Sequence, residues 1–324
     1  MVEIYGTLGP ACASTEILEE MFRAGMTGMR LNLSHVSLPN AAEQVEAFHT
    51  AAARAGLSPK LLIDMQGPEL RVGALADPMP LELGQEIKLG GDGIPMPAEV
   101  LEKLKPGQEI LLNDGKLLLQ VTEGKSMAKV LRGGLLQSRK SIALPGLRVT
   151  LPALTEADLA NLSRAKEYGV TGVMQPFVRS REDLETVRTA LNAVGGDAIR
   201  LFAKIESREG LERLESLLPA ADEIVIARGD LGNAMPLWEL PAAQKQIAAA
   251  CRRAGKPFMV VTQMLSSMEQ NPVPTRAEVS DIFNAVLDGA SSVMVTGETA
   301  AGRYPVEVIR YLSATVREAE RFEP

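Results

Sequence analysis

Short apolar runs and amphipathic segments alternate along most of the chain. In the first part, three β-rich runs are separated by helical patterns at residues 14–24 and 40–54: VEIYG, MRLNL and KLLID. The alternation returns near Leu151, where helical patterns follow capping signatures with an acidic residue three positions on: Thr155 with Asp158, Ser180 with Asp183, and Thr275 with Glu278. The pattern predicts repeated strand–helix units on both sides of a different central segment.

The later apolar runs complete a set of eight strands. They are predicted at 170–175, 199–204, 223–227, 257–261 and 292–295. Eight strand–helix units in about 250 residues is the size of a closed parallel barrel. We therefore expect an α/β fold of the (β/α)8 TIM-barrel class, with an open doubly wound sheet as the alternative.

The central segment, roughly residues 74–146, has a different pattern. It contains a Pro-Gly turn at Pro106 and the stretch EILLNDGKLLLQV, in which NDG separates two β-rich runs and indicates a hairpin. We expect a barrel domain in two parts, residues 1–73 and 147–324, with a small β domain at 74–146 inserted after the third strand. An insertion at the carboxyl end of a barrel strand lies where a lid can exclude water.

Composition narrows the class of protein. The chain has 324 residues, 46% of them hydrophobic, and a net charge of −7 without a Lys/Arg block, so we expect no nucleic-acid partner. It begins without the features of a signal peptide, and no apolar run approaches the ~18 residues of a membrane span. Cys12 and Cys251 lie outside any CxxC pattern, which fits a reducing compartment. We expect a cytoplasmic protein with no membrane partner.

Histidine content limits the chemistry further. His35 and His49 are the only histidines in the sequence. Catalytic triads and multi-histidine metal sites are thereby nearly excluded. A metal site in this chain needs mainly oxygen ligands, which favours Mg²⁺ or Mn²⁺ over zinc.

Polar residues gather where the later predicted strands end, the face on which barrel enzymes build their sites. They are Lys204 and Glu206, Asp230 between two glycines, Thr262, and Thr296 with Glu298. Taken singly, these residues have ordinary explanations: a surface ion pair, a turn former and a helix cap. Together they supply carboxylates for a hard cation and an ammonium group that can neutralise charge on a transferring group or an enolate.

A second group of polar residues follows the second and third predicted strands. Its members are Arg30, Asn32, Ser34 and His35, then Asp64, Glu69 and Arg71. The planar fork of arginine suits phosphate, and the Asn, Ser and Asp oxygens suit a monovalent or hard cation. The alternation in RLNLSH is also what a half-buried strand produces, so this group is ambiguous by itself.

Read in order, ten stretches of the sequence resemble the pyruvate kinase family. They are TLGPA, MRLNLSH, IDMQGPELRVG, LNDG, LPALTEADL, AKIESREG, ARGDLG, VTQMLSSM, NPVPTRAEVSD and VTGETAAGRYP. The resemblance implies a barrel, a lid-like domain inserted after the third strand, and usually a C-terminal domain with effector and tetramer contacts. The chain stops before that last domain, so we expect no allosteric control by a sugar phosphate bound there. A homo-oligomer through the barrel domain stays open.

The resemblance also implies roles for individual residues. Glu206 and Asp230 would hold Mg²⁺ or Mn²⁺. K⁺ would be held by Asn32, Ser34, Asp64 and the main-chain oxygen of Met65. Glu69 is the residue type of the family's K⁺-dependent members. Phosphoenolpyruvate would be bound by Arg30, Arg71, Lys204, Gly229, Asp230 and Thr262. Catalysis would involve Lys204, Arg30, Thr262 and Thr296, with Lys204 stabilising the phosphoryl group in flight and Thr296 relaying a proton to the enolate. Nucleotide would be contacted by Thr7, Pro10, Asn32, His35 and Lys140, with Asp114 on the same lid segment.

The implied reaction is the glycolytic transfer of a phosphoryl group from phosphoenolpyruvate to ADP, giving pyruvate and ATP with Mg²⁺ and K⁺. Some positions depart from the family pattern: Met65 and Gln66 replace Thr and Lys, Val36 replaces Gly, and Pro176 and Thr296 replace Ser. Gln66 lacks a positive charge, and Pro176 lacks a hydroxyl and a donor. Two alternatives therefore stay open. One is another metal-dependent 2-oxo acid or enolate enzyme, of the oxaloacetate decarboxylase or aldolase type, and the other is a non-catalytic regulatory relative that binds phosphoenolpyruvate or nucleotide.

Overall fold

The computed structural model describes residues 1–113, 115–122, 124, 126–147, 149 and 151–322. The chain divides into two compact units. The barrel unit comprises Met1–Gly67, Ala153–Arg228 and Pro241–Pro324, and the inserted unit comprises Pro68–Pro152 and Gly229–Leu240. The domain boundaries expected at 73/74 and 146/147 stay predictions.

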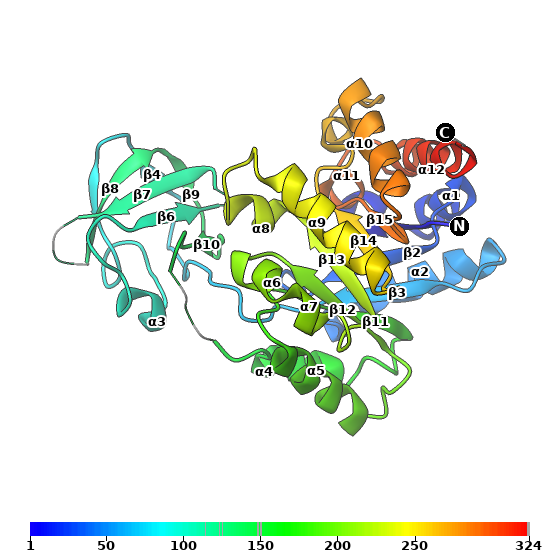
Figure 1. The fold of residues 1–324 in the computed structure, drawn as a ribbon, viewed down its shortest axis with the longest axis horizontal. Coiled ribbons are helices and arrows are strands. Elements are labelled where there is room, and N and C mark those ends of the chain that lie inside the picture. The colour runs from blue at the N-terminus through cyan, green and yellow to red at the C-terminus, as the bar shows by residue number, and fades with distance from the viewer. Residues whose placement is uncertain (114, 123, 125, 148, 150, 323–324) are drawn as a thin grey trace. The chain divides into compact units, whose positions relative to one another are not determined.

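Eight parallel strands close into a barrel in the order β1, β15, β14, β13, β12, β11, β3, β2 (Figure 1). Their bounds are β1 Glu3–Thr7, β2 Gly28–Asn32, β3 Lys60–Asp64, β11 Val170–Gln175, β12 Arg200–Ile205, β13 Glu223–Ala227, β14 Phe258–Val261 and β15 Ser292–Met294. At the carboxyl ends, Asn32 lies opposite Asp64, and Lys204 opposite Val225. The expected TIM-barrel class is confirmed, and the open doubly wound sheet was the wrong alternative.

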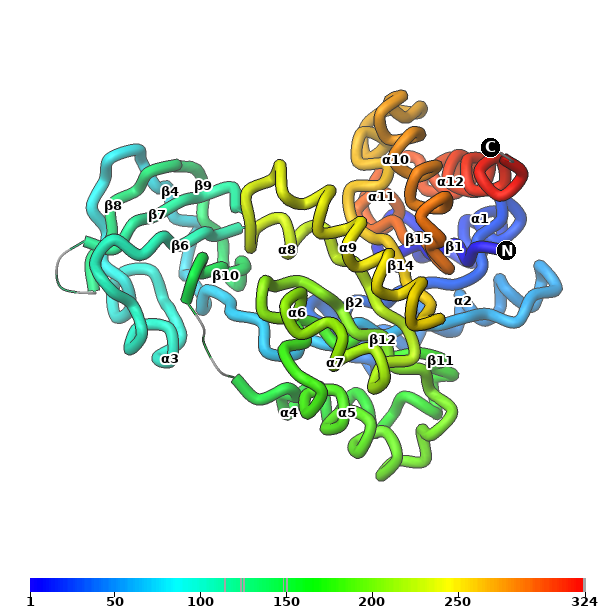
Figure 2. The backbone as a smooth tube through the Cα atoms, in the orientation of Figure 1, coloured from blue at the N-terminus to red at the C-terminus, as the bar shows by residue number. Residues whose placement is uncertain are grey.

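Helices of the barrel unit follow the strands and surround them (Figure 1). Their bounds are α1 Thr15–Ala24, α2 Ala42–Arg54, α4 Glu156–Leu162, α5 Arg181–Ala193, α6 Arg208–Glu212, α7 Leu214–Leu217, α9 Leu240–Arg253, α10 Arg276–Leu287, α11 Gly297–Ala300 and α12 Pro305–Arg321, with short 3-10 turns η1 Pro10–Cys12, η2 Pro39–Ala41 and η3 Ser266–Glu269. The first and last helices, α1 and α12, pack against each other, so both ends of the chain lie on one side of the barrel (Figure 2).

The three predicted capping signatures begin helices in the structure. Thr155 and Thr275 each form a capping box with the acidic residue three positions later, at the starts of α4 and α10. Ser180 accepts a hydrogen bond from the N–H of Asp183 at the start of α5. Each cap satisfies backbone N–H groups that the first helical turn leaves without an intrahelical partner.

Apolar side chains fill the barrel. The buried cluster consists of Tyr5, Leu62, Met174, Phe202, Val225, Ala227, Met259, Val261 and Met294. Since successive strand residues point to opposite sides, these inward positions alternate with outward positions covered by helices. The barrel is a packed core, and its polar chemistry is confined to the ends of the strands.

The inserted unit contains a five-stranded sheet of order β10, β6, β7, β8, β5 and a two-stranded sheet of β4 and β9. The bounds are β4 Met79–Leu81, β5 Glu86–Lys88, β6 Glu109–Leu112, β7 Leu117–Val121, β8 Met127–Arg132, β9 Gly134–Leu136 and β10 Ile142–Ala143, with the helices α3 Ala98–Leu101 and α8 Arg228–Asn233. The expected hairpin is confirmed, because β6 and β7 are antiparallel with Leu112 opposite Leu117. Asn113 and Gly115 in its turn have positive φ, at 52° and 76°, as an NDG turn favours.

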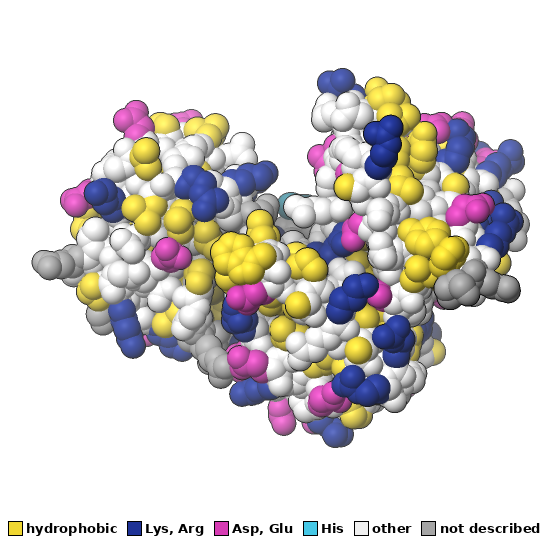
Figure 3. All heavy atoms as spheres, turned by 45° about the horizontal axis from the view of Figure 1, so that its top comes forward, with side chains coloured by type: hydrophobic (Ala, Val, Ile, Leu, Met, Phe, Trp, Pro, Cys, Tyr) yellow, Lys and Arg dark blue, Asp and Glu magenta, His cyan; other side chains and the backbone are white. Residues whose placement is uncertain are grey.

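No helix among the described residues is long and apolar enough to cross a membrane. Cys12 and Cys251 are buried free thiols, and burial raises their pKa values to about 11 and about 12. On the face seen in Figure 3, Lys and Arg side chains are interspersed with Asp and Glu side chains.

Candidate active site

Charged side chains on β2, on β3, and on and just after β12 meet at the carboxyl ends of the barrel strands. Arg30 on β2 donates from Nε to Oδ2 of Asp64 at 2.8 Å, and its Nη2 lies 2.7 Å from the same oxygen. Lys204 on β12 donates from Nζ to both Asp64 oxygens, at 3.1 and 3.0 Å. The same Nζ lies 3.0 Å from Oε1 of Glu206. Two cations and two carboxylates therefore form one connected cluster.

The cluster is largely withdrawn from solvent. The side chains of Arg30 and Lys204 are 12% exposed, whereas those of Asp64 and Glu206 are 3% and 1% exposed. Burial by itself raises the pKa of Asp64, but the charges of Lys204 and Arg30 outweigh it and hold that pKa below its ordinary value. The Lys204–Glu206 pair is thus a buried pair, and the surface ion pair considered from the sequence is not what forms.

Glu206 also joins two loops. Its Oε2 accepts a hydrogen bond from the backbone N–H of Phe177, which follows β11, at 2.8 Å. Phe177 has a φ of 48°, in the left-handed region that bulky residues rarely adopt. Such a conformation persists only where the surroundings over-determine it, and it is typical of functional sites.

Residues after β1 and β2 lie beside this cluster. Arg30 donates from Nη1 to Oγ1 of Thr7 at 3.5 Å, and Thr7 in turn donates to the carbonyl of Val295 at 2.9 Å. In the turn after β2, the side-chain oxygen of Asn32 accepts from the N–H of Ser34 at 3.1 Å. His35 donates its N–H to the carbonyl of Asn32 at 3.3 Å. Pro10 opens η1 beyond β1, and no hydrogen bond joins it to the cluster among the described residues.

The loop after β14 has strained backbone at the predicted residue. Thr262 and Gln263 have φ values of 75° and 53°, and Thr262 is β-branched. Arg228, which is 9% exposed, donates to the Thr262 carbonyl from Nε at 3.1 Å and from Nη2 at 2.6 Å. Its Nη1 donates to Oδ2 of Asp281 on α10 at 2.6 Å. Arg228, which the sequence reasoning did not single out, fixes the conformation of this loop.

Thr296 and Glu298 lie at the end of β15. Buried Glu298 accepts from the N–H of Thr296 at 2.6 Å through Oε2, and from the N–H of Leu265 at 3.1 Å through Oε1. The carboxylate of Glu298 therefore holds together the loops that follow β14 and β15. The hydroxyl of Thr296 also points to Oε2 of Glu298, at 3.3 Å.

The remaining predicted residues belong to the inserted unit. Arg71 donates to Oε2 of Glu69 from Nε and Nη2, at 3.0 and 2.7 Å, and from Nη1 to the carbonyl of Arg139 at 2.7 Å. Lys140 accepts at its carbonyl from the N–H of Val72 at 2.8 Å. Gly229 and Asp230 lie in the first turn of α8, and Asp114 lies outside the described residues.

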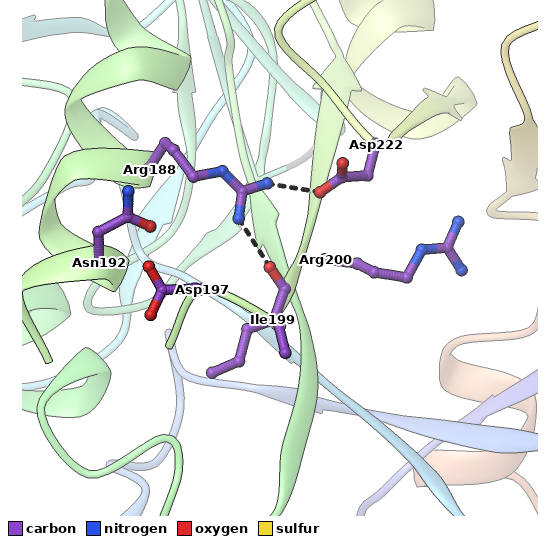
Figure 4. Close-up of a pocket in the computed structure, with 7 residues that line it drawn as sticks. Arg188, Asn192, Asp197, Ile199, Arg200 and Asp222 are labelled. Atoms are coloured by element: carbon purple, nitrogen blue, oxygen red, sulfur yellow. Dashed lines mark hydrogen bonds and ion pairs between the residues drawn. The ribbon is translucent and has the colours of Figure 1, made fainter. Parts of the chain in front are cut away.

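A hollow of about 390 Å³ lies at the opposite end of β12, around its first residue (Figure 4). Arg188 donates there to the carbonyl of Ile199 at 2.9 Å and to Asp222 at 2.5 Å. Arg200 pairs with Glu223 at 2.8 Å. Both arginines that line the hollow thus already have acidic partners.

The described residues contain no group of three or more His, Cys, Asp and Glu side chains that could hold a metal ion. Such groups are typical of zinc sites and all-protein cages. Mg²⁺ is commonly held by one or two carboxylates together with water and substrate oxygens. Buried Glu206 is a hard oxygen donor of that kind.

Comparison with known proteins is consistent with this geometry. The family description "Pyruvate kinase, barrel domain" matches residues 1–309. A protein of Methylorubrum extorquens named pyruvate kinase is 40% identical over 331 residues, which cover 98% of this chain and 68% of that protein. The chain belongs to the pyruvate kinase family.

Two further proteins named pyruvate kinase are similar over nearly the whole chain. The protein of Geobacillus stearothermophilus is 36% identical over 322 residues, covering 95% of this chain and 55% of that protein. Human pyruvate kinase PKLR is 39% identical over 344 residues, covering 98% of this chain and 59% of that protein. The chain thus spans little more than half the length of these two relatives.

Proposed function

We propose that this pyruvate kinase family member transfers the phosphoryl group of phosphoenolpyruvate to ADP, giving pyruvate and ATP in the cytoplasm as a step of glycolysis. The observation that carries the proposal is the largely buried ammonium of Lys204, which lies 3.0 Å from Glu206 and within 3.1 Å of both Asp64 oxygens, next to Arg30. An ammonium group that is shielded from solvent at the carboxyl ends of barrel strands is suited to stabilising charge on a transferring phosphoryl group.

The residues act by positioning and by charge. Arg30 and Arg71 would grip the phosphate, since the guanidinium fork matches phosphate oxygens. Lys204 would stabilise the phosphoryl group as its bond to the enol oxygen breaks and a bond to the terminal ADP oxygen forms. Thr262 and the backbone N–H groups of Gly229 and Asp230 would receive the substrate carboxylate.

The leaving group is the enolate of pyruvate, which needs one proton at carbon to become the product. We assign the relay of that proton to the hydroxyl of Thr296. In the structure this hydroxyl lies 3.3 Å from Oε2 of buried Glu298, and the same oxygen accepts a hydrogen bond from the backbone N–H of Thr296. Nucleotide contacts are assigned to Thr7, Pro10, Asn32, His35 and Lys140.

The donor atoms fit the proposed cations. Mg²⁺ or Mn²⁺ would be held by Glu206 and Asp230, and when bound it supplies positive charge that neutralises phosphate and enolate oxygens. K⁺ would be held by Asn32, Ser34, Asp64 and the carbonyl of Met65. Glu69 is the residue type that we associate with K⁺-dependent members of the family. Asn32 and Asp64 are paired across β2 and β3, and Asn32 binds the N–H of Ser34, so three of these four residues lie close together.

A coupled assay of ATP formation from phosphoenolpyruvate and ADP tests the proposal, with Mg²⁺ and K⁺ present. ATP formation that disappears in Glu206→Gln and persists in Glu223→Gln, a buried carboxylate at the opposite end of the barrel, supports it. Gln66 and Pro176 replace the family's usual Lys and Ser, so the same assay must also distinguish two alternative functions. Oxaloacetate decarboxylation without ATP formation would favour the other metal–enolate enzyme. Binding without turnover would favour a non-catalytic regulatory relative that binds phosphoenolpyruvate or nucleotide.

A further inference from the structure

One buried carboxylate holds the backbone just beyond β3. Asp158, which is fully buried on α4, accepts from the N–H of Gln66 through Oδ1 at 2.8 Å and from the N–H of Gly67 through Oδ2 at 3.0 Å. The same carboxylate closes the capping box by accepting from the N–H and hydroxyl of Thr155 at 2.9 and 2.8 Å. The start of α4 and the residues after β3 are therefore fixed by a single group.

The bond from Gln66 sets the direction of a carbonyl. The peptide between Met65 and Gln66 is planar and trans, so its N–H and C=O point in opposite directions. Because the Gln66 N–H points to Asp158, the Met65 carbonyl points away from it. The peptide on the other side is fixed too, since the N–H of Met65 donates to the carbonyl of Met174 at 3.1 Å.

The strand ladder does not continue to this carbonyl. In the parallel pairing of β3 with β11, the next hydrogen bond would run from the N–H of residue 176 to the Met65 carbonyl. Residue 176 is proline and has no N–H. Pro176 also closes the space at Gly67, where φ is +57° and a Cβ would lie 2.5 Å from the proline ring. Within the described part of the chain, no backbone N–H donates to the Met65 carbonyl, whose direction is fixed by the bonds on either side of it.

We propose that Asp158 is a positioning residue that aims the Met65 carbonyl at the monovalent cation. The inference rests on the proposed function, because the K⁺ site is part of it. Asp158 does not touch the cation and acts only through the Met65–Gln66 peptide. A site for a monovalent cation depends on the number and placement of its oxygen dipoles, so a carbonyl that is free to rotate binds K⁺ less well.

The test measures K⁺ binding in two ways. One is the rise of Tm with KCl, compared with tetramethylammonium chloride at equal ionic strength, and the other is the K⁺ concentration that half-activates ATP formation. Asp158→Asn keeps the size of the side chain but replaces one accepting oxygen with an NH₂ group. We expect the half-saturating K⁺ concentration to rise about tenfold or more in both measurements, as for other groups that orient a metal ligand. At saturating K⁺, kcat should largely recover.

Two further variants separate positioning from capping. Thr155→Ala removes the cap hydroxyl and leaves the bonds from Asp158 to Gln66 and Gly67, so it should lower Tm without changing the response to K⁺. Asp158→Glu keeps an acidic residue that suits the capping box but shifts the carboxylate by one methylene. It should weaken K⁺ binding like Asp158→Asn, and it provides the test if the Asn variant does not fold.

An unchanged K⁺ midpoint in Asp158→Asn or Asp158→Glu, with a fall in Tm like that of Thr155→Ala, would overturn the inference. Absence of any K⁺-dependent rise in Tm in the unmodified chain would overturn it as well. Failure of the proposed function gives a different result: no ATP is formed, while the Tm still rises with K⁺ and the Asp158 variants still weaken that rise.

Discussion

Replacement of Lys204 by methionine is the most informative perturbation of the buried cluster. The change keeps an unbranched side chain and removes the ammonium group. Asp64 would retain Arg30 at 2.7 Å, and Glu206 would retain the N–H of Phe177 at 2.8 Å. Asp64 would then keep one of its two cationic partners, and Glu206 would lose the ammonium group that lies 3.0 Å from it.

The size of the effect follows from these contacts. Breaking a buried ion pair by removing one partner costs about 3–5 kcal/mol, and we expect the lower end because Arg30 remains. Among the groups that lower the pKa of Asp64, Lys204 has the largest effect, so that pKa rises in the variant. A carboxyl with a lowered folded-state pKa contributes stability above its ordinary value of 3.8, and this stability is lost as pH falls through the lowered value. Acid unfolding should therefore begin at a higher pH in Lys204→Met.

The catalytic effect should be larger than the effect on binding. Removal of one group that stabilises developing charge typically lowers kcat about 10²–10³-fold. We expect that loss in kcat for ATP formation, with a much smaller change in the dissociation constant of phosphoenolpyruvate. The assays are steady-state kinetics, substrate titration, and urea unfolding at neutral and acidic pH.

Lys60→Met is the matched control, since Lys60 lies at the amino end of β3, is 42% exposed and pairs with Glu3. It should leave kcat unchanged. Equal kcat values for Lys204→Met and the unmodified chain would refute the assignment, as would equal losses in both methionine variants.

Arg30→Lys keeps the charge but loses the fork that binds Asp64, so KM for phosphoenolpyruvate should rise about tenfold, or about 1.4 kcal/mol, while exposed Arg23→Lys should not change it. Thr262→Gly should relieve about 1 kcal/mol of left-handed strain and raise Tm while lowering kcat/KM, and a lower Tm would contradict the strain argument. Na⁺ in place of K⁺ should slow ATP formation, whereas equal rates would contradict the roles of Asn32, Ser34 and Glu69. Burial raises the pKa of Glu223 above its ordinary value of 4.5, so the stability that the protonated carboxyl contributes is present below pH 4.5 and is lost as pH rises. The Tm difference between the unmodified chain and Glu223→Gln should therefore shrink or reverse between pH 4.5 and 7. A constant Tm difference would contradict this.

The elements of the barrel were predictable because their signals are local. The run predicted at 170–175 is β11, and the run at 223–227 is β13, each a continuous apolar stretch of the kind that parallel strands require. The ends differ by one residue in other cases, as for 257–261, which is β14 Phe258–Val261. Local hydrogen bonding at helix and strand ends, which one sequence defines only loosely, decides such boundaries.

The links between loops were not predictable, because they depend on closure of the barrel. The spacing of Thr155 and Asp158 predicted a capping box, but not the bonds from Asp158 to Gln66 and Gly67, which lie about 90 residues away in the sequence. The same holds for Arg228, whose bonds to Thr262 require β13 and β14 to be neighbours. The positive φ of Thr262 has no sequence signal, since a β-branched residue is disfavoured there.

A Mn²⁺ titration followed by electron paramagnetic resonance tests whether Glu206 and Asp230 share one divalent ion beside Lys204. We expect one Mn²⁺ site in the unmodified chain, weakened about tenfold or more in Glu206→Gln and in Asp230→Asn, and unchanged in Glu223→Gln. Mn²⁺ binding that is unaffected by the loss of either carboxylate would contradict it.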